Sequence, residues 1–182
     1  MTTRQYQEEQ PKTTRQYQGD QTKLEGGRGL EEWTTLYRAY NAIFKLTELA
    51  LLPHGLSLPQ LQLLGVLKKG GGTLTTGEIG QAMVKASQTI TGLVDRLEEP
   101  GSVERVFDRR DRRKTWVRMT EKGERKLAEA FPVGNRLAEE LSSVLTDEEL
   151  KDLQAKLEKL RSAAMDRLEA AFASSGMPFR RT

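Results

Sequence analysis

The sequence predicts a mostly α-helical chain of the α+β class, and three observations support this prediction. Most segments place apolar residues at alternating spacings of three and four, which is the period of a helix packed on one face. Only Val103–Phe107 and Thr115–Met119 alternate in the manner of half-buried strands. Helix-capping residues and glycine or proline stop signals separate these segments, so the bounds of each element can be predicted in order.

The first 28 residues are expected to form a disordered tail. Thr2–Lys12 and Thr13–Lys23 are two copies of one 11-residue unit that begins Thr-Thr-Arg-Gln-Tyr-Gln. This glutamine-, threonine- and charge-rich composition buries too little apolar surface to offset the entropy lost on ordering the chain. The alternative is a short basic arm that touches nucleic acid, although the net charge of the segment is only +1.

Order is predicted to begin with a long helix over Leu30–Leu51. Its apolar and aromatic residues recur at spacings of three and four, and Pro53-His54-Gly55 is a stop signal after it. This apolar stripe is too wide and too aromatic for the core of one small domain. The helix is therefore predicted to pack against a partner chain as well.

Three further elements follow in quick succession. Ser57 is predicted to cap a helix that Gly70-Gly71-Gly72 ends. Thr73–Thr75 is long enough for a single edge strand only. Thr76 is then predicted to cap a brief helix over Gly77–Met83.

A second short helix is predicted after the three-residue turn Val84–Ala86. Ser87 is expected to cap it, and Glu98–Gly101 to stop it. The two alternating runs that come next are joined by a polar connector, which predicts a β-hairpin. The apolar residues of the helix lie at positions i, i+3, i+4 and i+7, namely Ile90, Leu93, Val94 and Leu97.

The last third of the chain predicts two more helices. Thr120 should cap the first, which runs towards Leu145 and which Pro132 should kink or break. Thr146 and Glu149 form a capping box that opens the second, which has a leucine-rich face.

This order of elements is that of a winged helix-turn-helix, a fold that reads double-stranded DNA. Such reading needs a helix with one buried face and a small polar outer face that fits the major groove, which is ~12 Å wide. The helix after the turn meets that need, because hydroxyl and amide groups lie opposite its apolar stripe. The residues expected to contact DNA from the turn and this helix are Lys85, Ser87, Gln88, Thr89, Thr91 and Arg96.

The positive charge of the chain is concentrated in the predicted hairpin. The whole chain has a net charge of +3, whereas residues 105–118 alone carry seven basic and two acidic side chains. Concentrated positive charge on a near-neutral body is typical of a protein that binds a polyanion. The cations expected to contact the DNA backbone or a narrow minor groove are Arg109, Arg110, Arg112, Arg113 and Lys114.

Residues 57–127 resemble the DNA-binding core of the MarR (multiple antibiotic resistance regulator) family of transcription factors. The most specific part is the wing pattern Asp108…Asp111-Arg112-Arg113…Met119-Thr120-Glu121-Lys122-Gly123. The resemblance implies a homodimer whose two recognition helices enter successive major grooves of a pseudo-palindrome. It also implies that Arg113 reaches into the minor groove and that Asp111 orients the wing arginines.

The expected division of the chain follows from these elements and this resemblance. It consists of a tail over 1–28, an N-terminal dimerisation helix over 29–56, a winged helix-turn-helix DNA-binding domain over 57–120, and C-terminal dimerisation helices over 121–175.

The chain departs from the family's pattern at Gly92, Pro100 and Ser102. Gly92 stands where an arginine or a larger residue is common, and a mid-helix glycine costs ~1 kcal/mol relative to alanine. Pro100 and Ser102 replace the usual lysine and apolar residue around Gly101. These departures concern base preference and the packing of the wing, not the fold.

Members of the family often bind small, frequently aromatic or phenolic effectors between the dimerisation helices and the DNA-binding lobe. By this resemblance Trp33, Tyr37, Tyr40 and His54 would line or border an effector pocket. The alternative is that the three aromatic residues belong to the dimer core and that His54 is a cap or surface residue.

Composition argues against an enzyme. The chain has no cysteine and one histidine, so nucleophilic and metal catalysis are poorly supplied and no cofactor is expected. No apolar run approaches the ~18–20 residues needed to cross a bilayer, so a cytoplasmic protein without membrane contact is expected.

The predicted function is a dimeric transcriptional regulator, a repressor by preference, that a small molecule releases from its DNA. The alternative is a winged-helix module that binds DNA without sequence preference or binds another protein. In that case the charge run would be a solvated loop, or residues 87–97 would form a plain core helix.

Overall fold

The computed structural model describes residues 29–107 and 114–175. The predicted tail over 1–28 lies outside these residues, as do the predicted DNA contacts Arg109, Arg110, Arg112 and Arg113 and the wing-orienting Asp111. The chain divides into two units, residues 1–37 and 38–182, and each is described by itself. The described part of the first unit is the start of the first helix, and every later element belongs to the second unit.

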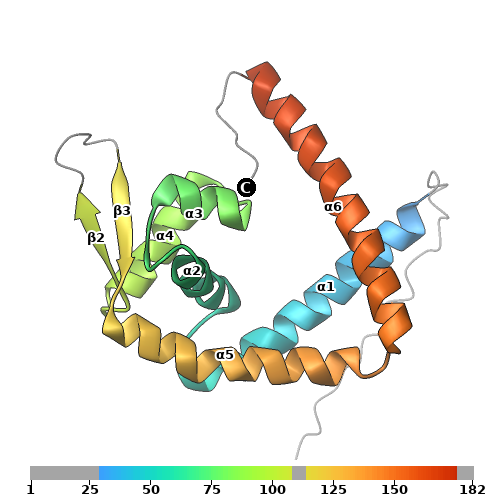
Figure 1. Ribbon diagram of the computed structural model, residues 1–182, viewed down its shortest axis with the longest axis horizontal. Helices are drawn as coiled ribbons and strands as arrows, with labels where there is room; N and C mark the ends of the chain where they lie inside the picture. Colours follow the sequence, from blue (N-terminus) through green and yellow to red (C-terminus); the bar gives the residue numbers. More distant parts are fainter. Residues whose placement is uncertain (1–28, 108–113, 176–182) are drawn as a thin grey trace, which may run out of the picture. The chain divides into compact units, whose positions relative to one another are not determined.

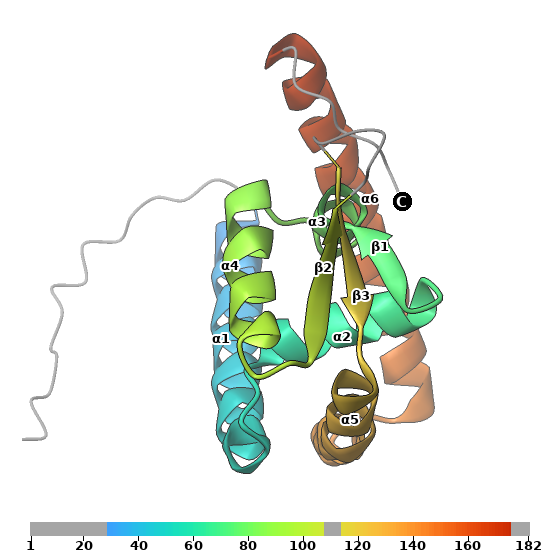
Figure 2. The same cartoon turned by 90° about the vertical axis from the view of Figure 1, so that its left-hand side faces the viewer.

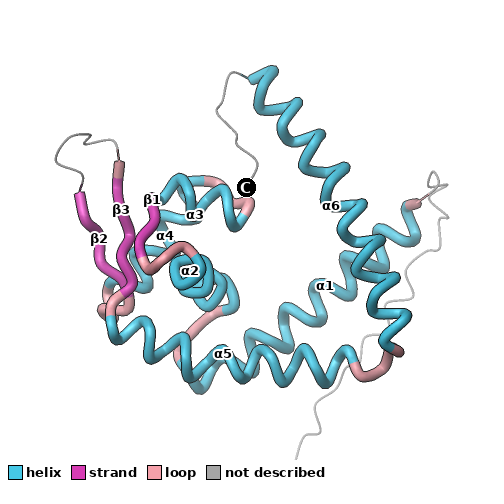
Figure 3. Tube along the Cα trace, in the orientation of Figure 1, coloured by secondary structure: helices cyan, strands magenta, loops and turns pink. Residues whose placement is uncertain are grey.

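Helices dominate the chain, and the strands are short (Figures 1 and 3). The elements in chain order are α1 (Leu30–Leu51), the short 3₁₀ helix η1 (Leu52–His54), α2 (Leu58–Lys69), β1 (Thr73–Thr75), α3 (Thr76–Met83), α4 (Ser87–Glu98), β2 (Val103–Phe107), β3 (Thr115–Met119), α5 (Glu121–Ser142) and α6 (Asp147–Ser175). The predicted α+β class, mostly helical with a winged helix-turn-helix order, is confirmed.

The strands form one antiparallel sheet in the order β1-β3-β2. Val117 of the central strand β3 pairs with Leu74 of β1 on one side and with Arg105 of β2 on the other. Both the hairpin and the single edge strand that the sequence predicts are therefore present. Figure 2 shows β2 running beside α4, with which it is in contact.

Helix caps agree with the sequence at three positions. The hydroxyl of Ser57 accepts a hydrogen bond from the backbone N–H of Gln60 at 3.3 Å, and the Gln60 side chain accepts one from the N–H of Ser57 at 2.8 Å. Thr120 accepts from the N–H of Gly123 at 3.1 Å. Thr146 and Glu149 form the predicted reciprocal capping box.

Two predicted caps are wrong by one residue. Thr75, not Thr76, caps α3, because Glu78 lies three residues after Thr75 and its carboxylate accepts a hydrogen bond from the Thr75 backbone N–H at 2.7 Å. At α4 the N–H of Ile90 donates to the carbonyl of Ala86 at 3.2 Å, so Ala86 is the N-cap. Ser87 is consequently the first helical residue, and no side-chain hydrogen bond caps this helix.

Pro132 does not break α5, which runs continuously from Glu121 to Ser142. Proline removes one N–H and so leaves the carbonyl four residues earlier without its helical partner. Pro132 and Ala128 are both exposed, so water can hydrate that carbonyl and the helix can continue.

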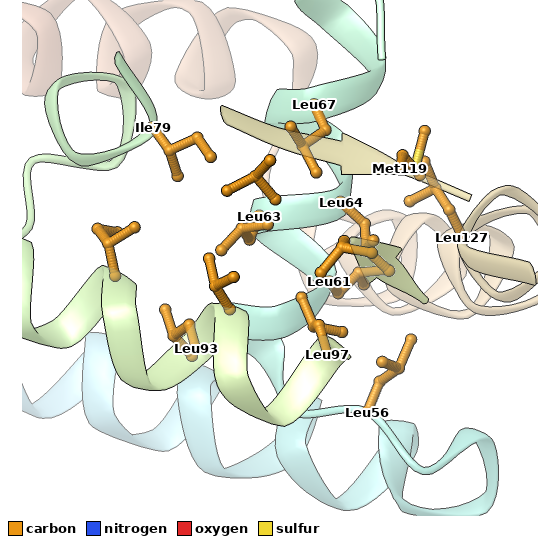
Figure 4. Close-up of a cluster of buried hydrophobic side chains, with 14 of the residues drawn as sticks. Leu56, Leu61, Leu63, Leu64, Leu67, Ile79, Leu93, Leu97, Met119 and Leu127 are labelled. Atoms are coloured by element: carbon orange, nitrogen blue, oxygen red, sulfur yellow. The ribbon is translucent and has the colours of Figure 1, made fainter. Parts of the chain in front are cut away.

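The core lies where α2 meets α3, α4, the sheet and α5. Figure 4 shows side chains from these elements pointing toward one another, and Leu63, Leu64 and Leu67 of α2 are fully buried among them. Burial of one such leucine contributes about 1.5–3 kcal/mol. The predicted inward positions are confirmed, because Leu61, Leu64, Leu67, Ile90, Leu93, Val94 and Leu97 are all buried.

Two helices keep large apolar side chains outside this core. On α1, Trp33, Tyr37 and Tyr40 expose 61%, 62% and 55% of their surface. On α6, Leu157 and Leu160 are also exposed. No helix in the described ranges is both long enough and apolar enough to span a membrane.

Candidate nucleic-acid interface

The turn between α3 and α4 is tight. The N–H of Lys85 donates to the carbonyl of Gly80 at 2.9 Å, and the N–H of Val84 donates to that of Gln81 at 3.1 Å. Val84 adopts a left-handed conformation with φ of 51°, which is rare for a β-branched residue. This turn sets α4 against α3 and leaves Lys85 exposed at the start of the polar face.

The outer face of α4 carries the residues that the sequence predicts to contact DNA. Ile90, Leu93, Val94 and Leu97 are buried on the opposite face, which fixes the rotation of the helix. The side chains of the predicted contacts are all exposed, namely Ser87, Gln88, Thr89, Thr91 and Arg96. The structure therefore keeps all five side chains clear of the core.

Two details of this face were not evident from the sequence. The Thr91 hydroxyl donates to the carbonyl of Ser87 at 3.0 Å, so it can offer a ligand its oxygen and its methyl group but not its proton. A Cβ atom at Gly92 would meet no atom within 4 Å. There is room for a larger side chain at this position, where the family that the chain resembles commonly has one. Gly92 therefore offers DNA no side chain on this part of α4.

Lys114 is the described end of the wing, and it is exposed. Hydrogen bonds from Thr75 hold the pKa of Glu78 below its ordinary value, and the charge of Lys114 adds a smaller contribution. Lys114 therefore acts electrostatically on the start of α3. The pairing of Thr75 with Trp116 also joins β3 of the wing to the residue that caps α3.

Two arginines of the basic segment 105–118 are already ion-paired. Arg118 Nε lies 2.6 Å from a carboxylate oxygen of Glu104, which faces it across the hairpin. Arg105 pairs with Asp95 and Glu98 of α4. Acids outside the segment thus offset part of its charge. The count of charges along the sequence could not reveal these ion pairs, because the strand register and the contact between α4 and β2 bring the acids to the arginines.

An apolar cavity of about 480 Å³ lies between α2, α3 and α5. Its walls include Leu61, Met83 and Phe131, with the polar groups of Lys69 and Asn135 at its edge. A second cavity of about 570 Å³ shares Lys69 and Phe131 with the first. The signal in the sequence was a pair of mid-helix glycines, Gly65 on α2 and Gly134 on α5, which put no side chain into this space.

The residues predicted to border an effector pocket lie elsewhere. Trp33, Tyr37, Tyr40 and His54 are not among the residues that line either described cavity. Tyr40 makes a tilted ring contact with Phe44, with ring centroids 5.9 Å apart. Their role as effector contacts stays a prediction.

Comparison with known proteins identifies the family. Residues 54–114 match the model of the MarR family. The HTH-type transcriptional regulator MhqR of Bacillus subtilis is 34% identical over 125 residues, which are 68% of this chain and 85% of that protein. The chain belongs to the MarR family. It is therefore a MarR-family transcriptional regulator, as the wing pattern implied.

Solved structures of MarR-family and related regulators share the fold. The organohalide-sensing RdhR transcriptional regulator, in its 2,4-dichlorophenol-bound form, has a TM-score of 0.74 at 21% identity and covers 81% of this chain and 88% of its own. A mutant MarR from E. coli, complexed with operator DNA, has a TM-score of 0.67 at 23% identity and covers 72% of this chain and 94% of its own. At these identities the likeness concerns the winged-helix fold alone.

Proposed function

We propose that this regulator binds a pseudo-palindromic operator as a homodimer and that a small molecule releases it. In this proposal α4 enters the major groove, and the wing over 105–118 lies on the adjacent backbone and minor groove. The observation that carries the proposal is the rotation of α4: its apolar stripe is buried, and its hydroxyl and amide groups are exposed together.

The charge of this surface supports DNA as the partner. Exposed cations lie on the turn, on the recognition helix and beside the loop end of the wing, namely Lys85, Arg96 and Lys114. The sequence places four further arginines, between 109 and 113, at the tip of the hairpin. Such a cluster favours phosphate contacts, and arginine also fits a narrow minor groove.

A homodimer accounts for the apolar surface that one chain leaves uncovered. Large exposed apolar side chains recur along α1 and α6, which are the N- and C-terminal helices of the fold. Contiguous apolar surface of this kind marks an interface in most globular proteins. Two copies would place two recognition helices at the spacing of adjacent major grooves, ~34 Å apart.

An aromatic or phenolic molecule is the proposed effector class. The described cavity between α2 and α5 has an apolar lining with Phe131 in its wall and a cation, Lys69, at its edge. The effector contacts proposed on α1 and just after it remain Trp33, Tyr37, Tyr40 and His54. Helix α2 packs against α3, α4 and α5. A ligand bound between α2 and α5 would therefore shift the population towards dimers in which the two recognition helices are spaced differently.

A footprint on the DNA upstream of the gene tests the proposal. We expect one discrete and near-palindromic protected site, with release on adding simple phenols. Uniform protection of any duplex would contradict operator recognition and favour a winged-helix module without sequence preference. A discrete footprint that no phenol or aromatic acid weakens would contradict the effector class only.

A further inference from the structure

We infer that Arg105 is a positioning residue for DNA reading: it holds the recognition helix α4 and the wing strand β2 at one spacing, and it does not itself contact DNA. The inference rests on the proposed function, in which α4 and the wing bind the same duplex. It assigns Arg105 a role different from that of the other cations in the basic segment.

The guanidinium of Arg105 joins the two elements by several hydrogen bonds. Its Nη2 donates to Asp95 Oδ1 at 2.6 Å and to the carbonyl of Thr91 at 3.3 Å, while its Nη1 donates to the Glu98 carboxylate. The backbone N–H of Arg105 donates to the other oxygen of that carboxylate at 2.9 Å. The three acceptor residues follow one another at spacings of four and three, so they form one edge of α4.

Burial separates Arg105 from the arginine beside it in the sheet. The Arg105 side chain exposes 18% of its surface, whereas that of Arg118 exposes 56%. Burial opposes the charge of Arg105, but its hydrogen bonds to Asp95 and Glu98 and the charges of these two acids together outweigh it and raise the pKa of the guanidinium. The group is thus a fixed cation whose donors are directed at α4, and a planar fork suits several acceptors at once.

The acids that Arg105 pairs with stand on the helix proposed to enter the groove. Asp95 exposes 59% of its side chain. An unpaired carboxylate there would repel the phosphates of a bound duplex. Arg105 therefore neutralises the acidic edge of α4 and, by the same bonds, ties β2 to it. Removal of the guanidinium should weaken binding through these acids.

The test is a mutant cycle on the footprinted operator fragment. We expect Arg105→Gln to weaken binding about tenfold, a coupling of the size seen between contacting residues. In a background that already carries Asp95→Asn and Glu98→Gln, the same change should weaken binding by no more than about twofold, because its partners are gone. An arginine that contacts phosphate directly would lose the same factor in both backgrounds.

The salt dependence gives a second readout. Loss of one phosphate contact lowers the slope of log affinity against log salt by about 0.9 in either background, whereas loss of a positioning residue changes it only while Asp95 and Glu98 can repel the DNA. Arg105→Lys keeps the charge but not the fork, so it should also bind more weakly with an unchanged slope. This variant carries the test if Arg105→Gln does not fold, as thermal unfolding would show.

Arg161→Gln is the control, since it removes an exposed, ion-paired arginine from α6, outside the proposed DNA-binding surface. It should bind within about twofold of wild type, the small effect usual for an exposed pair. The inference is overturned if Arg105→Gln binds normally, if Arg161→Gln loses as much, or if Arg105→Gln lowers the slope equally in both backgrounds. Uniform binding of the wild type to any duplex would contradict the proposed operator recognition alone, and the cycle would then be measured on that duplex.

Discussion

Gly123 is a residue at which α5 closely approaches the backbone just before β2. A Cβ atom there would lie 2.1 Å from the carbonyl oxygen of Ser102, so no larger residue fits without a shift of backbone. This contact gives the glycine of the wing pattern a physical reason. Gly92, on α4, is the opposite case, because nothing lies within 4 Å of the position its Cβ would take.

We expect Gly123→Ala to lower the free energy of unfolding by about 1–3 kcal/mol, the usual cost of an overpacked core position. Gly92→Ala is the control in another helix, and it should raise the same quantity by up to ~1 kcal/mol because alanine favours helix. Urea unfolding of both variants measures the difference. Changes of equal sign would contradict the close approach of α5 to Ser102.

Ser102 is fully buried, and its hydroxyl has no hydrogen-bond partner among the described residues. The resemblance to the family implies that an apolar residue is usual at this position. Ser102→Ala should therefore leave the protein as stable or raise its free energy of unfolding by about 1 kcal/mol, since a buried unpaired hydroxyl is costly. A loss of more than about 1 kcal/mol by urea unfolding would show that the hydroxyl has a partner after all.

At the scale of elements, the junction between β3 and α5 depends on one threonine. The Thr120 hydroxyl accepts from the N–H of Gly123 and donates to the carbonyl of Gly101 at 2.7 Å, so it caps α5 and holds the turn before the wing. Caps and turns of this kind are local, which is why the sequence predicted the start of α5 correctly. The strand register and the bonds of Arg105 are not local, and the sequence did not predict them.

Thr120→Ala should lower the free energy of unfolding by about 1 kcal/mol, as expected for a lost N-cap, and by somewhat more because a second bond is lost. Thr120→Ser keeps the hydroxyl and should restore most of this stability. The measurement is thermal or urea unfolding of both variants. If the serine and alanine variants unfolded alike, the hydroxyl would not be the stabilising group.

The wing tip lies outside the described residues, so its prediction comes from the sequence and from the family resemblance. Arg113→Ala should weaken operator binding and reduce the slope of log affinity against log salt by about 0.9, the value for one phosphate contact. Arg161→Ala removes an exposed arginine that pairs with Glu158 on α6, and it should change neither quantity. Unchanged affinity of the Arg113 variant would contradict the wing contact.

At the scale of the whole molecule, the exposed apolar side chains of α1 and α6 concern assembly. These side chains lie on the terminal helices and do not contribute to the buried core. The net charge of +3 does not oppose association of two copies. In the proposed function operator recognition and assembly are linked, since a palindromic site is read by two recognition helices.

Leu157→Glu combined with Leu160→Glu should convert the proposed dimer into a monomer, because it places charges in an apolar interface. Lys159→Glu changes the charge of an exposed residue on the same helix and should leave the dimer intact. Light scattering measures the mass of both variants. Circular dichroism would verify that the double variant is folded. A dimer that survives the double substitution would place the interface away from this face of α6.

The sequence by itself determined where helices and strands lie, which face of each is apolar, and that a basic hairpin follows a helix-turn-helix. These properties follow from local periodicity, caps and stop signals, which act within a few residues. Tertiary structure alone decided that Arg105 is bound to α4, that Gly123 must lack a side chain, and that a cavity lies between α2 and α5. Each depends on which surfaces meet across the fold, and no local pattern specifies that packing.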